Sequence, residues 1–127
     1  MYNILVVDDS STIRKIIIRC INHTQIEVGT LFEAADGEEA LAVLSEHTIH
    51  LVMTDINMPK MNGLELLSRL KAEDRWKDVP VLLITTEGRV DTVLEAANKG
   101  AAGYVKKPFT AGDIQAKIEP LLCGASA

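Results

Sequence analysis

The sequence contains little cysteine and no long apolar run. Its two cysteines, Cys20 and Cys123, lie far apart and form neither a CxxC pair nor a metal-binding spacing. We expect both to be reduced thiols of a cytoplasmic protein, with a disulfide between them as the alternative. No apolar run approaches the roughly 20 residues that a membrane-spanning helix needs. The first residues also lack the basic segment that opens a signal peptide.

Positive charge is scarce as well. The chain has 13 lysines and arginines against 18 acids, a net charge of −5, and Lys106-Lys107 is only a pair. This balance argues against non-specific nucleic-acid binding, and we expect neither a nucleic acid nor a membrane as a direct partner. His23, His47 and His50 have no cysteine or carboxylate at ligand spacing, which favours surface or helix-end positions over a metal site.

Short apolar runs alternate with helical patterns along the chain. The predicted strands cover residues 3–7, 26–34, about 49–54, 79–85 and 104–106. The predicted helices begin near residues 10–11, 38, 62–63, 90 and 110. The first, second and fourth helices end near residues 23–24, 46 and 98, and the third frays through residues 73–78.

This alternation determines the expected fold class. Strands that alternate strictly with helices imply a parallel sheet covered by helices on both faces, and right-handed crossovers leave few topologies. We therefore predict an α/β protein with a flavodoxin-like, doubly wound, five-stranded parallel sheet in the order 2-1-3-4-5, and five helices. No repeat, low-complexity segment or linker is visible, so residues 1–127 are predicted to form a single domain.

Several local signals refine the helix boundaries. Gly100 is placed to stop the fourth helix, and Thr110 with Asp113 resembles a capping box at the start of the fifth. Pro120 should end or kink that last helix because proline removes one backbone hydrogen bond. Arg14 is expected on a polar face of the first helix, and Trp76 is expected to anchor its loop by packing or to contact a partner.

Acids, hydroxyls and a lysine follow the ends of the predicted strands. Asp8-Asp9 ends the first strand, Asp55 the third and Thr85-Thr86 the fourth, and Lys107 follows the fifth. In this architecture the carboxyl ends of the strands meet at one edge of the sheet, where ligands bind. Three neighbouring carboxylates cannot all stay ionised without a cation.

Mg²⁺ is the cation that such ligands favour, because it takes one or two carboxylates together with substrate phosphate. Our hypothesis is that Asp8 and Asp9 hold Mg²⁺, while Asp55 both binds it and acts as a nucleophile that forms an aspartyl-phosphate. A backbone carbonyl at Asn57 would be a further protein ligand. Phosphoryl transfer needs mainly positioning and charge neutralisation, which Lys107 and the hydroxyl of Thr85 would supply together with the ion.

Each of these residues also has an ordinary structural interpretation. Asp8-Asp9 could end a strand and cap a helix, Asp55 could belong to a turn, and Lys107 could be a solvated surface lysine. Thr85 and Thr86 are ordinary residues at a strand end, and Tyr104 could be a half-buried strand aromatic. Their equivalent positions in successive strand–helix units favour the functional interpretation.

These residues together resemble the receiver domain of two-component response regulators. The resemblance rests on Asp8-Asp9 after an apolar strand, residues 54–67 around Asp55, Thr85, Tyr104 and Lys107-Pro108-Phe109, and it spans residues 2–122. It implies that Asp55 accepts a phosphoryl group from the phosphohistidine of a histidine kinase. It also implies a Mg²⁺ site formed by Asp8, Asp9, Asp55 and the carbonyl of Asn57.

The resemblance assigns further roles. Thr85 and Lys107 would bind the phosphoryl group, and the Lys107–Pro108 peptide would be cis. Thr85 and Tyr104 would be the switch pair, with the aromatic ring turning inward on phosphorylation. Asn57 and Glu87 match positions that tune the phosphoryl lifetime.

The switch would reshape the face formed by the fourth helix, fifth strand and fifth helix, which would contact a downstream target. Its candidate residues are Val90, Val93, Lys99, Tyr104, Lys106 and Lys117. Two positions depart from the family pattern. Thr86 stands where alanine is commoner, and its bulk could restrict the swing of Tyr104. Asn62 replaces the usual aspartate.

The resulting expectation is a stand-alone signalling switch that acts through protein–protein contacts, since the sequence ends soon after the fifth helix. Chemotaxis is the favoured setting, and a phosphorelay intermediate or phosphate sink is the alternative. An aspartate-nucleophile phosphatase would need a second acid two residues after Asp55, where Asn57 stands. A flavin module of the same fold is disfavoured because Asp8-Asp9 would repel the flavin phosphate.

Overall fold

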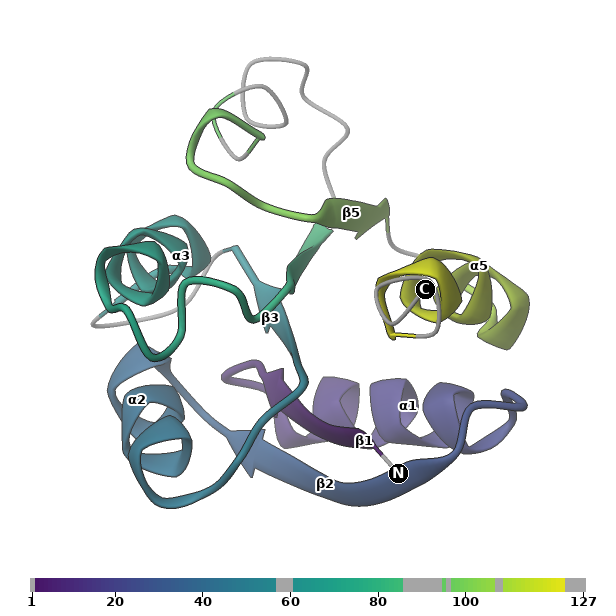
Figure 1. Cartoon of the computed structure of the whole chain (residues 1–127). Coiled ribbons are helices and arrows are strands. Elements are labelled where there is room, and N and C mark those ends of the chain that lie inside the picture. The colour runs from purple at the N-terminus through teal and green to yellow at the C-terminus, as the bar shows by residue number, and fades with distance from the viewer. Residues whose placement is uncertain (1, 57–60, 86–94, 96, 107–108, 123–127) are drawn as a thin grey trace.

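The computed structural model describes residues 2–56, 61–85, 95, 97–106 and 109–122 (Figure 1). The strands are β1 (Tyr2–Val7), β2 (Val28–Ala34), β3 (Leu51–Asp55), β4 (Val81–Thr85) and β5 (Gly103–Lys106). The helices are α1 (Ser11–Asn22), α2 (Gly37–Glu46), α3 (Gly63–Ala72) and α5 (Ala111–Leu122). Most of the predicted fourth helix, residues 90–98, lies outside the described residues, although Glu95, Ala97 and Asn98 are helical.

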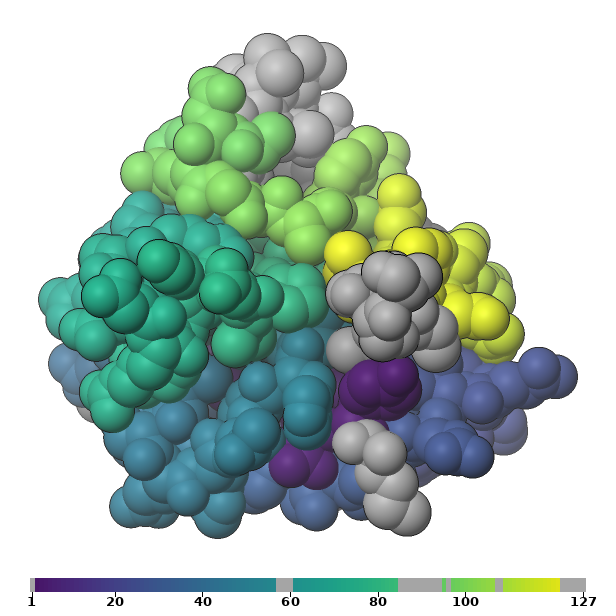
Figure 2. All heavy atoms as spheres, in the orientation of Figure 1, coloured from purple at the N-terminus to yellow at the C-terminus, as the bar shows by residue number. Residues whose placement is uncertain are grey.

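The strands form one parallel sheet in the order β2-β1-β3-β4-β5. This order confirms the predicted flavodoxin-like topology. Helices α1 and α5 lie on one face of the sheet, and α2 and α3 lie on the other (Figure 1). In the same orientation, the space-filling view shows the atoms of neighbouring elements in contact across the layers that the ribbons outline (Figure 2).

β1 shows why the sheet carries a core on each face. Ile4 and Val6 belong to the apolar cluster beneath α1 and α5, whereas Leu5 and Val7 belong to the cluster beneath α2 and α3. All four are fully buried. Successive strand residues point to opposite faces, so a strand without polar alternation is stable only when helices cover both sides.

Side-chain caps fix the helix starts. The oxygens of Ser10, Asp36 and Asn62 accept hydrogen bonds from the backbone amides three residues on, at 3.3, 2.9 and 2.8 Å. At α5, Thr110 Oγ1 accepts from the Asp113 amide at 3.1 Å, and the Asp113 carboxylate accepts from the Thr110 amide at 3.0 Å. The predicted capping box is therefore confirmed. Asn62, the departure from the family pattern, keeps a capping oxygen without a charge.

Two other boundary predictions have different outcomes. Gly100 has a φ of +97°, which confirms its predicted role as a helix stop because glycine enters this region without strain. For Pro120 we predicted that the last helix either ends or kinks there, and the first of these is wrong because α5 continues to Leu122. Proline removes one hydrogen bond, and Leu121 packs against the apolar cluster of α1 and α5, which holds the final residues in place.

The remaining expectations concern Trp76 and the cysteines. Trp76 is only 8% exposed and belongs to the cluster beneath α2 and α3, so it is a packing anchor. Cys20 is a free thiol on α1, where burial raises its pKa more than neighbouring Arg19 lowers it. Cys123 lies outside the described residues. No helix within the described parts of the chain has the length and apolar character needed to cross a membrane.

Candidate acidic and phosphoryl-binding site

Three carboxylates converge at the carboxyl edge of the sheet. Asp8 and Asp9 follow β1, and Asp55 ends the neighbouring strand β3. One oxygen from each lies within 4.8 Å of the others. The parallel register explains this convergence. Val7 of β1 pairs with Thr54 of β3, so the next residue of each strand is an acid at the same level.

The three acids differ in their exposure to solvent. Asp8 is 1% exposed, whereas Asp55 is intermediate and Asp9 is exposed. The acid set therefore has one deeply placed member and an open side formed by Asp9. That combination allows a small charged ligand to reach the carboxylates from solvent.

The donor set fits Mg²⁺. Carboxylate oxygens are the hard ligands that this ion prefers, and octahedral coordination at about 2.1 Å places ligand oxygens up to about 4.2 Å apart. The 4.8 Å spread of the acids is slightly wider. Because Asp9 is exposed, its side chain can make the small adjustment needed. The remaining proposed ligand, the carbonyl of Asn57, lies outside the described residues.

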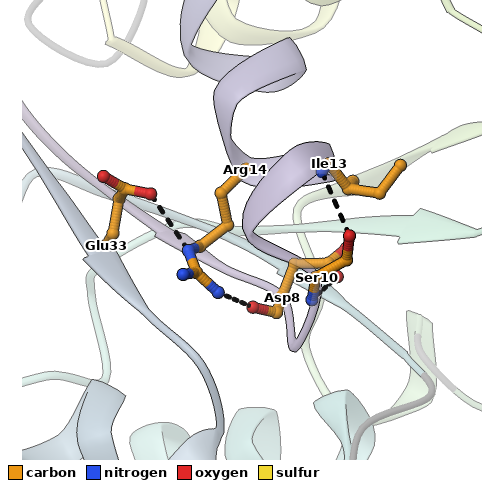
Figure 3. Close-up of polar contacts among 5 residues, drawn as sticks. All are labelled: Asp8, Ser10, Ile13, Arg14 and Glu33. Carbon is orange, nitrogen blue, oxygen red and sulfur yellow. Dashed lines mark hydrogen bonds and ion pairs between the residues drawn. The ribbon is translucent and has the colours of Figure 1, made fainter.

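Three hydrogen bonds hold Asp8, of which Figure 3 draws those with Ser10 and Arg14. Its amide donates to the Ala34 carbonyl at 3.1 Å, and its Oδ1 accepts from the Ser10 amide at 2.9 Å. Its backbone carbonyl accepts from Arg14 Nη1. The turn between β1 and α1 is thus fixed before any ligand binds.

Arg14 is the residue at this site that sequence reasoning missed. Its Nε donates to Glu33 Oε1 at 3.0 Å, and its side chain is only 16% exposed. Side chains on a helix lean toward its N-terminus, so a long cation in the second turn can reach back to the strand end. That directional rule was the available signal, although it cannot show which atom the cation contacts.

Asp55 is positioned partly by its close packing against α3. The Gly63 amide donates to the Ile56 carbonyl at 2.8 Å. A Cβ at position 63 would lie 2.3 Å from the Asp55 backbone oxygen and 2.9 Å from the Ile56 Cα. Only glycine allows the helix to start this close to the strand.

A second glycine, Gly37, allows α2 to pack closely against Met61. A Cβ on Gly37, at the start of α2, would lie 2.7 Å from Met61 Sδ and 2.8 Å from Met61 Cβ. Met61 is buried and stands just before the Asn62 cap of α3. Helices α2 and α3 therefore both pack closely on the segments that follow the acid-bearing strand.

Other candidate residues are only partly described. Thr85 ends β4 and pairs with Lys106 of β5, while its neighbour Ile84 pairs with Asp55, so the Thr85 backbone lies at the same edge as the acids. Nothing further is described for the Thr85 side chain. The remaining candidates, Asn57, Thr86, Glu87, Val90, Val93 and Lys107, lie outside the described residues, as does the predicted cis Lys107–Pro108 peptide.

On the predicted output face, Tyr104 is 38% exposed and Lys117 Nζ lies 5.7 Å from the centre of its ring. This distance is within the range of a cation–π contact. Lys106 is also exposed. Lys99 instead donates to Ser68 Oγ on α3 at 3.3 Å, which places its ammonium beside that helix.

A comparison of the chain with known protein families agrees with the fold and the acid cluster described above. The family model described as the response regulator receiver domain matches residues 4–119, so the chain belongs to the response regulator receiver family. Members of this family that resemble CheY are signalling proteins rather than conventional enzymes.

Individual relatives are chemotaxis proteins. The chain is 42% identical over 118 residues to chemotaxis protein CheY of Pseudomonas aeruginosa, covering 93% of this chain and 94% of the relative. It is 40% identical over 123 residues to chemotaxis protein CheY-3 of Vibrio cholerae, covering 93% and 89%.

Solved structures show the same likeness. Vibrio cholerae CheY4 superposes with a TM-score of 0.85 at 33% identity, over 96% of this chain and 99% of that one. CheY in the Borrelia burgdorferi complex of CheX, CheY, BeF3 and Mg²⁺ has a TM-score of 0.84 at 30% identity, over 94% and 88%.

Proposed function

We propose that this receiver accepts a phosphoryl group on Asp55 from the phosphohistidine of a histidine kinase, in a Mg²⁺-dependent reaction. The observation that carries the proposal is the approach of the Asp8, Asp9 and Asp55 carboxylates within 4.8 Å at the carboxyl edge of the sheet. Family membership supports phospho-acceptor signalling as its general role.

In the proposed reaction, an Asp55 carboxylate oxygen attacks phosphorus and the P–N bond to the donor imidazole breaks. The electron pair of that bond leaves with the imidazole, which can then take up a proton. Bound Mg²⁺ would neutralise charge on the phosphoryl oxygens. Asp8 and Asp9 would hold the ion together with Asp55 and the Asn57 carbonyl, while Lys107 and Thr85 would bind the phosphoryl oxygens.

Phosphorylation would act by shifting a two-state equilibrium. In our proposal the Thr85 hydroxyl moves toward the phosphoryl group and the Tyr104 ring turns inward. The exposure of Tyr104 supports this proposal, because a ring that is exposed to solvent can become buried when it turns inward. A downstream target would recognise this change on the predicted output face. That face contains Tyr104, Lys106 and Lys117, and we also assign to it Val90, Val93 and Lys99.

We propose a downstream protein in chemotaxis as the target of this face. Support comes from relatives named as chemotaxis proteins and from the Borrelia burgdorferi structure, in which a CheY protein is bound to CheX. We also propose that residues 1–127 form one receiver domain, in line with the family match over residues 4–119.

The intact mass after incubation with acetyl phosphate tests the central step. We expect a Mg²⁺-dependent phosphoryl adduct on the wild-type protein and none on Asp55→Asn. Asp36→Asn is the matched control, because asparagine caps a helix about as well as aspartate and Asp36 caps α2. The control should keep the adduct. An adduct on Asp55→Asn, or none on the wild type in any condition, would overturn the proposal.

A further inference from the structure

The peptide between Asp8 and Asp9 is held by a side chain outside the acid cluster. Arg14 Nη1 donates to the Asp8 carbonyl, which belongs to that peptide (Figure 3). The Asp8 carboxylate accepts from the Ser10 amide on the other side of the same turn, at 2.9 Å. The backbone carbonyl and the side chain of Asp8 are therefore both tied to the start of α1 and its N-cap.

Arg14 is itself fixed by an ion pair. Figure 3 shows its guanidinium extending between Glu33 and Asp8, and its Nε lies 3.0 Å from Glu33 Oε1. Glu33 belongs to β2, Asp8 follows β1 and Arg14 lies on α1. The guanidinium fork thus joins three elements, and its planar donors give it a fixed direction.

We propose that Arg14 is a positioning residue for divalent-cation binding, a role that rests on the proposed function. By holding the Asp8 carbonyl, it fixes the plane of the Asp8–Asp9 peptide and so the direction in which the Asp9 side chain leaves the backbone. Asp9 is the exposed member of the acid set, and its carboxylate receives no comparable constraint from burial. The guanidinium contacts the carbonyl through one nitrogen and Glu33 through another.

The charge of Arg14 allows positioning to be separated from electrostatics. A positive charge near three carboxylates opposes cation binding, so Coulomb's law alone predicts that Arg14→Gln binds Mg²⁺ more tightly. Positioning predicts the opposite. Removing a residue that orients a metal ligand typically lowers the affinity for the metal by about tenfold or more. The sign of the change therefore distinguishes the two explanations.

The test is a MgCl₂ titration of ¹⁵N-labelled protein, followed by the amide chemical shifts of Asp9 and Ser10. We expect Arg14→Gln to weaken Mg²⁺ binding by about tenfold. Arg14→Lys keeps the charge but not the fork, and it should also bind more weakly than the wild type. Arg19→Gln, which removes an equal charge from an exposed site on the same helix, should stay within about twofold because exposed charges are screened.

The dispersion of the amide spectrum in EDTA shows whether each variant is folded. If Arg14→Gln does not fold, Arg14→Lys carries the test alone. If both Arg14 variants bind Mg²⁺ as tightly as the wild type or more tightly, the positioning role is overturned and the proposed function stays intact. No shift on the wild type would instead overturn the metal site, and this inference with it.

Discussion

The first residue of α3 lies directly against the backbone of the proposed phospho-acceptor. A Cβ on Gly63 would be only 2.3 Å from the Asp55 carbonyl oxygen, closer than non-bonded atoms can approach. The helix start and the strand end therefore cannot move independently. This relationship makes position 63 a sensitive probe of how precisely Asp55 must be placed.

We expect Gly63→Ala to destabilise the protein and to slow phosphorylation. The added methyl must push α3 away from Asp55, and overpacking of this kind costs about 1–3 kcal/mol. Urea unfolding measures the loss of stability, and the rate of adduct formation with acetyl phosphate measures the effect on Asp55.

Gly112→Ala is the matched control for this prediction. It lies in the first turn of α5, where the nearest atom to a Cβ is Thr110 Oγ1 at 3.6 Å, an ordinary contact. Alanine there should be neutral or stabilising by up to about 1 kcal/mol. Equal effects of the two substitutions on the phosphorylation rate would contradict the proposed close packing at Asp55.

Removing the cation above Tyr104 should shift the proposed switch. Lys117 lies over the ring at 5.7 Å, and an exposed cation–π contact contributes about 0.5–1 kcal/mol. We expect Lys117→Gln to increase the inward population of the ring by about two- to fivefold. Ring chemical shifts of labelled Tyr104, measured with and without BeF3 and Mg²⁺, report that population.

Lys106→Gln provides the comparison, because it removes the same charge from an exposed position on β5. That variant should leave the shifts of the unphosphorylated protein near those of the wild type. If both substitutions moved the Tyr104 ring equally, the effect would come from the net charge of the face and not from the contact with Lys117.

The Cys20 thiol should titrate at a higher pH in the folded protein than in the unfolded chain. Burial raises its pKa above the ordinary value of 9.0, while Arg19 lowers it by less. In a Cys123→Ser background, the pH midpoint of alkylation by iodoacetamide should be higher in the native protein than in urea.

The same shift has a consequence for stability. As the pH rises above about 9, the unfolded chain loses the Cys20 proton first, so the native state binds more protons and stability falls with pH. This contribution is fully present below the unfolded pKa. Cys20→Ala should remove that part of the pH dependence of urea unfolding, and an unchanged slope would show that Cys20 does not contribute to it.

Some features were predictable because they depend on neighbouring residues alone. The capping box of Thr110 and Asp113 and the helix stop at Gly100 follow from local backbone chemistry, and both match the structure. The two-faced burial of β1 follows from its uninterrupted apolar run. The end of α5 was not predictable in this way, because Leu121 gains its contacts from the core and not from its neighbours in sequence.

The sequence alone determined the alternation of strands and helices, and with it the parallel sheet that brings Asp8, Asp9 and Asp55 to one edge. Periodic burial and strand polarity are sufficient for that result. Only the tertiary structure decided which atoms meet there: Arg14 with the Asp8 carbonyl, and Gly63 with the Asp55 backbone. These contacts join segments separated along the chain, and their distances depend on how the helices pack against the sheet.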